Sequence, residues 1–243
     1  MKLATALFLT CLATPALAQD SAWDFRTTLY LWFPGMSATV ETPEGTVSSD
    51  VSAADALSNL DMGFMGSVGA QKGNVILWGD LLYTDLGASE NTPHGLLWDQ
   101  VRVSQQLTAV TGYALYDVAP DPAVQVGLGA GFRYFNLSAD TVLTGGNQPR
   151  VENSLSDSWW VPVLAAQLYA PLNDRWFVDG VADWGQAGSD TNTWQVYAGV
   201  GYKINETWST QLGYRYMNFG RTIEGKAIDT DLSGILAGVT ISF

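Results

Sequence analysis

Alternation of apolar and polar residues is the feature that most constrains what this chain can fold into. The end of the chain places these apolar side chains on one face of an extended strand: Ile235, Ala237, Val239, Ile241 and Phe243. The positions between them carry glycine, threonine and serine, with Leu236 as the exception. The same period of two recurs over residues 124–134 and 194–203. Because successive side chains of a strand point to opposite faces, this pattern predicts strands with one face for lipid and one for a polar interior.

Ten segments have this character, and an even number of antiparallel strands closes a transmembrane barrel with both termini on the periplasmic side. Eight strands are the alternative if one hairpin is misassigned, and twelve if the pair around Pro43-Glu44-Gly45 also spans the membrane. Short and long connections alternate between the segments, as in outer-membrane barrels. The predicted strands cover residues 23–33, 61–71, 75–86, 97–117, 123–141, 158–171, 175–184, 192–203, 207–219 and 229–243.

The composition fits a chain that faces lipid. Charged residues make up 14%, well below the roughly 25% of soluble domains. No run of eighteen apolar residues follows the first eighteen positions, so a transmembrane helix is not expected. Acidic residues outnumber basic ones 24 to 11, which excludes the basic footprint of a nucleic-acid-binding protein. Aromatic residues near strand ends are expected to form two interfacial girdles: Trp23, Trp32, Trp98, Tyr116, Trp159, Tyr169, Trp176, Trp184, Trp194 and Tyr202.

The first eighteen residues have the pattern of a secretory signal peptide. Lys2 precedes an apolar run over residues 3–12, and Ala16-Leu17-Ala18 provides a cleavage site of small residues. We therefore expect a signal peptide at 1–18 and one barrel domain at 19–243. Cys11 is the sole cysteine of the sequence, so the mature chain is expected to contain no disulfide.

Two groups of motifs resemble those of a known class of proteins. The terminal Gly238, Ile241 and Phe243 are similar to the C-terminal signal by which outer-membrane barrels are recognised for assembly. The repeated Gly131-Phe132-Arg133-Tyr134 and Gly213-Tyr214-Arg215-Tyr216, with Tyr30-Leu31-Trp32, resemble Gram-negative outer-membrane β-barrels, broadly the small OmpA-type and OmpW-type barrels. The resemblance implies an all-β transmembrane barrel in the cell outer membrane, and it implies no activity.

Charged residues on the polar faces of the strands are the candidate functional residues. They cannot be solvated by lipid, so they must pair with one another or meet water. An interior ion-pair network and a charged constriction in a narrow pore are both compatible with this set. The predicted lumen residues are Asp24, Arg26, Asp61, Asp80, Arg102, Arg133, Asp179, Asp183, Lys203 and Arg215.

The segment after the first strand is expected to carry the one short helix. Residues 36–51 alternate around Pro43-Glu44-Gly45, and Ser52 then precedes a helical pattern from Ala53 to Leu60. Its apolar positions are Ala53, Ala56, Leu57 and Leu60. The helix could cap the barrel on the extracellular side or fold into its mouth as a plug.

Catalytic and metal sites are not expected. Hydrolytic barrels need a general base beside a nucleophile or an attacking water, and this chain has one histidine, His94, with no serine or aspartate two residues away. No histidine pair or mature cysteine offers a zinc site, and Asp229-Thr230-Asp231 is too short to indicate calcium. We expect no cofactor and no catalytic residue.

The expected role is passive, either structural or as a narrow pore for ions and small solutes. The alternative is an adhesin or receptor that acts through its extracellular loops. Expected partners are outer-membrane lipid and lipopolysaccharide, the barrel assembly machinery and divalent cations at the rim. The predicted loops carry a net charge of −7, ten acids against three bases: Glu41, Glu44, Asp50, Asp55, Glu90, Glu152, Asp157, Asp190, Glu224 and Asp229, with Arg150, Arg221 and Lys226.

Overall fold

A single antiparallel sheet makes up almost the whole molecule. The computed structural model describes residues 23–42, 45–91, 100–118, 124–145, 149–223 and 225–243. The elements in chain order are β1 (Asp24–Thr42), β2 (Gly45–Val51), α1 (Ala53–Ser58), β3 (Leu60–Lys72), β4 (Val75–Asn91), β5 (Gln100–Asp117), β6 (Gln125–Thr144), β7 (Val151–Pro171), β8 (Trp176–Gln186), β9 (Thr191–Lys203), β10 (Trp208–Ile223) and β11 (Lys226–Ser242).

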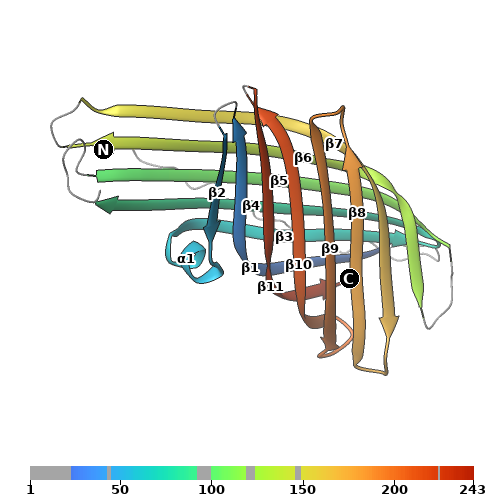
Figure 1. Ribbon diagram of the computed structural model, residues 1–243. Helices are drawn as coiled ribbons and strands as arrows, with labels where there is room; N and C mark the ends of the chain where they lie inside the picture. The colour runs from blue at the N-terminus through green and yellow to red at the C-terminus, as the bar shows by residue number, and fades with distance from the viewer. Residues whose placement is uncertain (1–22, 43–44, 92–99, 119–123, 146–148, 224) are drawn as a thin grey trace, which may run out of the picture.

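The sheet closes on itself into a barrel of ten strands. β3 to β11 each pair with the next strand, and β11 pairs with β1 from Arg26↔Ser242 to Glu41↔Ala227. β2 pairs with the upper part of β1, from Met36↔Val51 to Thr42↔Gly45, and is an extension of the wall rather than a membrane strand. Figure 1 shows the front strands crossing those of the back wall, with α1 beside β1 and β2. The prediction of ten strands and one short helix is confirmed.

The wall strands keep the alternation over most of their length, so the barrel has an apolar exterior. Leu29, Leu31, Val68 and Leu164 are all more than half exposed, as side chains that face lipid must be. Three of the expected girdle residues are placed differently. Trp32 (3% exposed) and Trp159 (5% exposed) point into the interior, and Tyr169 lines cavities of the lumen. The girdle prediction is wrong for these three residues, since nearness to a strand end does not say on which face of the strand a side chain lies. Trp98 lies outside the described residues.

Several strands continue beyond the predicted limits. β7 begins at Val151 rather than 158, and its ladder with β6 extends to Leu143↔Val151. Backbone pairing satisfies the hydrogen bonds of a hairpin in water as well as in lipid, so the ladder does not have to end at the membrane surface. The loops that the sequence predicts on this side are therefore partly extended hairpins. Among the described residues no helix has the length and apolar character needed to cross a membrane.

One part of the wall lacks continuous pairing. β1 pairs with β3 only from Asp24↔Gln71 to Leu29↔Gly66, and its pairing with β2 starts at Met36. Residues 30–35 of β1 thus have no ladder partner on this side within the described strands. At this place the backbone N–H of Trp32 donates to the sulfur of Met65 at 3.3 Å. We call this interruption the seam.

Candidate functional site

Two buried arginines organise the middle of the barrel interior. Arg133 of β6 is fully buried and faces Asp183 of β8, with its Nη2 2.5 Å from one carboxylate oxygen and its Nη1 3.0 Å from the other. Its remaining donors bond to the hydroxyls of Thr111 (3.0 Å), Thr193 (2.9 Å) and Tyr113 (3.2 Å). All the groups around this guanidinium are acceptors, so the charge is both paired and hydrogen-bonded, as a charge away from water must be.

Arg215 of β10 forms the second centre. It donates to Asp80 of β4 at 3.0 Å, to the hydroxyl of Tyr30 at 2.9 Å and to the amide oxygen of Gln195 at 2.7 Å. Tyr30 in turn donates to the other oxygen of Asp80 at 2.6 Å. The ring of Trp32 lies over the guanidinium, 5.0 Å from it, and completes its surroundings with a cation–π contact.

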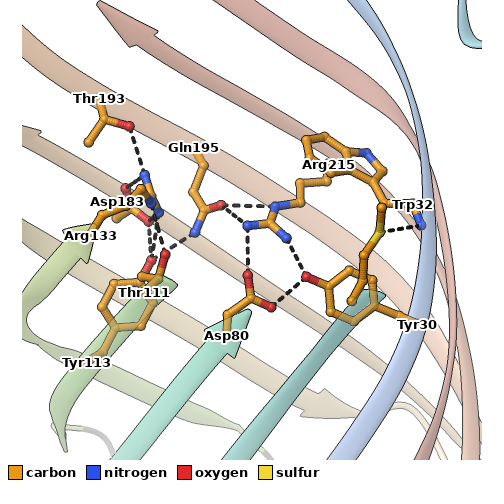
Figure 2. A network of polar contacts seen from close by, with 11 residues as sticks. Tyr30, Trp32, Asp80, Thr111, Tyr113, Arg133, Asp183, Thr193, Gln195 and Arg215 are labelled. Atoms are coloured by element: carbon orange, nitrogen blue, oxygen red, sulfur yellow. Dashed lines mark hydrogen bonds and ion pairs between the residues drawn. The ribbon is translucent and has the colours of Figure 1, made fainter. Parts of the chain in front are cut away.

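Gln195 of β9 joins the two centres. Its amide nitrogen donates to the hydroxyl of Tyr113 at 2.8 Å, and that hydroxyl contacts both Arg133 and Asp183. Figure 2 shows the resulting network running across the interior. We call it the polar belt, and it consists of Tyr30, Asp80, Tyr113, Arg133, Asp183, Gln195 and Arg215, from β1, β4, β5, β6, β8, β9 and β10.

Apolar side chains fill the interior on the extracellular side of the polar belt. Phe135 and Met217 have no exposed surface, and the rings of Phe135, Trp159 and Phe219 pack against one another with centroids 4.9 to 6.1 Å apart. Leu236, the exception in the terminal alternation, belongs to this group at 4% exposure. The apolar cluster comprises Trp32, Met65, Leu82, Leu107, Phe135, Leu137, Trp159, Val161, Met217, Phe219, Ile223, Leu232 and Leu236.

The interior on the periplasmic side of the polar belt is less filled. A cavity of about 120 Å³ lies against the belt, with Arg26, Gln71 and Asp179 in its lining. A wider cavity of about 740 Å³ near the periplasmic turns is lined in part by Lys203, whose ammonium lies 5.9 Å from the ring of Tyr169. The cavities with polar and charged side chains in their lining therefore lie on the periplasmic side of the polar belt.

The structure brings some of the predicted lumen residues together and separates others. Asp80, Arg133, Asp183 and Arg215 form the charged centres of the polar belt. Arg26, Asp179 and Lys203 line the cavities below it. The other three, Asp24, Asp61 and Arg102, are exposed and belong to neither set.

The assignments of Asp61 and Arg102 to the lumen are wrong for identifiable reasons. Asp61 is the extra residue of a β-bulge between Leu60 and Met62, and a bulge shifts the alternation by one position. Arg102 falls on the opposite parity to the buried inward residues of β5, such as Leu107 and Tyr113. It lies in the part of β5 beyond the membrane, where either face meets water and polarity no longer marks the interior. Asp24 is the first residue of β1 and is exposed at the periplasmic end.

The neutral members of the network are not among the predicted lumen residues. Tyr30, Tyr113, Gln195, Thr111 and Thr193 supply most of its hydrogen bonds. Each lies at a position whose side chain points inward, so the alternation of the strand already indicates its place in the lumen. The prediction was limited to charged residues and therefore omitted them.

The predicted acidic rim is partly paired. Arg221 bonds to Asp157 at 2.9 Å, and Arg150 bonds to Glu152 at 2.8 Å in an exposed pair. Asn218 donates to both Asp229 and Asp231. In the part of the chain that the structure describes, no three acidic, histidine or cysteine residues gather into a metal-binding group. Glu44, Glu224 and His94 lie outside that part.

The three residues of the expected assembly signal lie on the closing strand or directly after it. Gly238 and Ile241 belong to β11, where they pair with Tyr30 and Thr27 of β1. Phe243 exchanges two backbone hydrogen bonds of 2.9 Å with Phe25, and the two rings stack at 6.0 Å. The last residue of the chain is therefore part of the junction that closes the barrel.

The closed wall, the apolar exterior and the buried polar belt define a transmembrane β-barrel. The chain belongs to the outer membrane protein beta-barrel domain family, whose model matches residues 4–243. The protein is thus an outer-membrane β-barrel protein, and its location is the cell outer membrane. No curated protein sequence matches the chain.

Solved structures share the architecture. The outer membrane protease OmpT from Escherichia coli superposes with a TM-score of 0.63 at 10% identity, covering 95% of this chain and 100% of that one. Ail, the attachment invasion locus protein of Yersinia pestis, superposes with a TM-score of 0.38 at 9% identity, covering 92% of this chain and 99% of that one. The likeness to OmpT concerns the barrel fold alone.

Proposed function

We propose that this protein is a sealed β-barrel with a passive, structural role in the outer membrane, and that it does not conduct ions. The observation that carries the proposal is the pair of buried arginine centres, together with the apolar cluster above them. Arg133 and Asp183 have no exposed side-chain surface, and Arg215 and Asp80 retain 4% and 2%. A charged ring that selects ions in a pore has to present its charges to the water-filled path. Here each charged side chain is instead paired with another and shielded from water.

The filling of the lumen supports the same conclusion. Conduction through the extracellular half would require ions to pass Phe135, Met217 and Phe219, each at most 1% exposed. Moving an ion into such surroundings is costly because no group there replaces its hydration shell. The hollow periplasmic part then serves as a vestibule rather than as a channel.

Planar-bilayer recording of the refolded protein tests the proposal. The wild-type barrel should show no steady single-channel steps. A variant with alanine at the four charged belt positions (Asp80, Arg133, Asp183 and Arg215) should leak ions, provided heat-modifiable migration on gels shows that it is folded. Steady conductance of the wild type would overturn the proposal, and its reversal potential in a salt gradient would then give the ion preference.

Surface binding is the second candidate function. β1 with β2, and β6 with β7, form hairpins whose ladders continue into water, and their exposed positions carry hydrogen-bonding side chains such as Ser48 and Ser154. Hairpins that extend beyond the membrane in this way can present a ligand-binding surface to the outside of the cell. Deletion of residues 37–50 should abolish binding to host or neighbouring cells if this role is real, while barrel assembly continues.

Our proposal includes no catalytic activity. A hydrolase needs a base in contact with its nucleophile or attacking water, and the single histidine of the sequence, His94, has no serine or aspartate two residues away. Lipid, lipopolysaccharide and the barrel assembly machinery remain the partners that we propose, because any barrel of this kind has to meet them.

A further inference from the structure

An apolar cavity lies at the seam, separate from the polar belt and from the two cavities on its periplasmic side. Its volume is about 190 Å³, similar to an engineered cavity of about 150 Å³ that remains dry and binds benzene. Apolar side chains provide nearly all of its surface, and its few polar contributors include Thr84 and Gln105. The amide of Gln105 already donates to the sulfur of Met36 at 3.6 Å. The seam cavity therefore suits hydrocarbon rather than water.

The seam cavity extends through the wall of the barrel. Its lining includes Leu82, Leu107 and Leu232, which point inward and are at most 5% exposed. It also includes Leu31, which points outward and is 61% exposed. A cavity can join both faces of a sheet only where the ladder is interrupted, and residues 30–35 have no partner strand on this side.

The seam lies at the depth of the membrane. On β3 the outward side chains Val68, Phe64 and Met62 are 58%, 52% and 62% exposed, so the apolar exterior continues alongside the opening. The tight turn at Gly73, between β3 and β4, marks the opposite, periplasmic end of the same strand. The opening therefore faces the outer leaflet of the bilayer.

Helix α1 forms the remaining side of the seam cavity. Ala53, Ala56 and Leu57 line it from α1. The helix ends at Ser58 rather than at the predicted Leu60, and Leu60 lines the cavity from the start of β3. The helix begins at Ser52, whose hydroxyl accepts from the backbone N–H of Asp55, and it packs against β1. Instead of capping or plugging the mouth, α1 thus contributes its apolar face to a lateral site.

We propose that the seam cavity binds one acyl chain of an outer-leaflet lipid. The occupant follows from two properties: the apolar lining of the cavity, and its opening toward the lipid-facing side of the wall beside Leu31. Lipid is also the solvent at this opening, so its chains are present there at a concentration that no dissolved apolar molecule reaches. The site is independent of whether the lumen conducts.

Trp32 reports occupation of this site. It lines the seam cavity and is shielded from the bilayer by the wall. In vesicles of phosphatidylcholine brominated along the acyl chains, the emission that Trp32 contributes, measured as wild type minus Trp32→Phe, should be quenched. Trp159 is equally buried and does not line the cavity, so the emission lost in Trp159→Phe should be unquenched.

Filling the cavity should remove the quenching. Gly63 lines the cavity, and a Cβ there would lie 3.5 Å from a methyl of Leu60, which is ordinary contact, so we expect Gly63→Phe to place its ring in the cavity. Ala56→Phe fills it from α1, outside the barrel ladder, and therefore serves if Gly63→Phe does not fold. Gly79→Phe is the matched control, since it places the same ring elsewhere on the wall, where the nearest neighbour of a Cβ is 3.4 Å away.

Loss of Trp32 quenching in both filled variants, with retention in Gly79→Phe, is the expected result. Quenching of Trp32 no greater than that of Trp159 would overturn the proposal. Equal quenching before and after filling would also overturn it, because bromine would then act through the wall. If a free bromoalkane quenches Trp32 in unbrominated vesicles while brominated lipid does not, the occupant is a small apolar solute and the assignment to lipid is wrong.

Discussion

Replacing Arg133 by methionine should strongly destabilise the barrel. The guanidinium makes five hydrogen bonds, two of them to Asp183, which has no exposed side-chain surface. Methionine keeps most of the volume but leaves the carboxylate of Asp183 buried without its counter-charge. Breaking a buried pair in this way costs about 3–5 kcal/mol.

Equilibrium unfolding in urea, in lipid vesicles, measures this loss. With a slope of about 3 kcal/mol per M, a loss of about 3–5 kcal/mol lowers the urea midpoint by about 1–1.7 M. The double variant Arg133→Met/Asp183→Leu removes both charges, and such replacements are often close to neutral. It should therefore be more stable than Arg133→Met alone.

The comparison of single and double variants decides the argument. If Arg133→Met unfolds at the wild-type midpoint, the ion pair contributes nothing to stability. Asp183→Leu alone completes the comparison. If the stability lost by the double variant equals the sum of the losses in Arg133→Met and Asp183→Leu, the two side chains do not act as a pair. Either result would refute the description of the polar belt as a mutually dependent network.

Three further changes test other parts of the structure. Deleting Phe243 removes its two backbone bonds to Phe25, so the yield of heat-modifiable barrel in outer membranes should fall; an unchanged yield would contradict its role in closure. Gly131→Ala places a Cβ 1.8 Å from the Gly112 carbonyl oxygen and should lower the free energy of unfolding by roughly 1–3 kcal/mol. Gly79→Ala should leave it unchanged, and the urea midpoints of the two variants measure the difference. If divalent cations bridge the acidic rim to anionic lipid, as we propose, adding Mg²⁺ should raise the urea midpoint in vesicles that contain lipopolysaccharide more than in vesicles without it.

The sequence predicted the wall of the barrel well because alternation is a local property. Each strand records in its own residues which face meets lipid, so the ten strands could be counted, and Arg133 and Arg215 assigned to the interior, without knowledge of the fold. The same reasoning failed at Asp61, where a bulge shifts the parity, and at Arg102, where the strand has left the bilayer.

Features that depend on several strands at once were beyond the sequence. Gln195 joins the two arginine centres only because closure brings β5, β9 and β10 to the same height. The apolar face of α1 could be predicted from the sequence. The seam that it covers could not, since the seam exists only because the β1–β3 ladder stops at Leu29↔Gly66. The register of two paired strands and the point at which their pairing stops depend on both strands, so neither can be deduced from one segment alone.

The polar belt also has a consequence for the rates at which the barrel folds and unfolds. The bond from Arg215 to Tyr30 joins residues 185 positions apart, and the bond from Arg215 to Asp80 joins residues 135 apart. Bonds between strands so far apart in the sequence require the wall to curve round on itself, so we expect them to form late in assembly. Interactions made after the transition state slow unfolding and leave the folding rate unchanged. The belt thus acts as a latch that gives the assembled barrel a long lifetime, a property that matters in a membrane where a lost protein is not easily refolded.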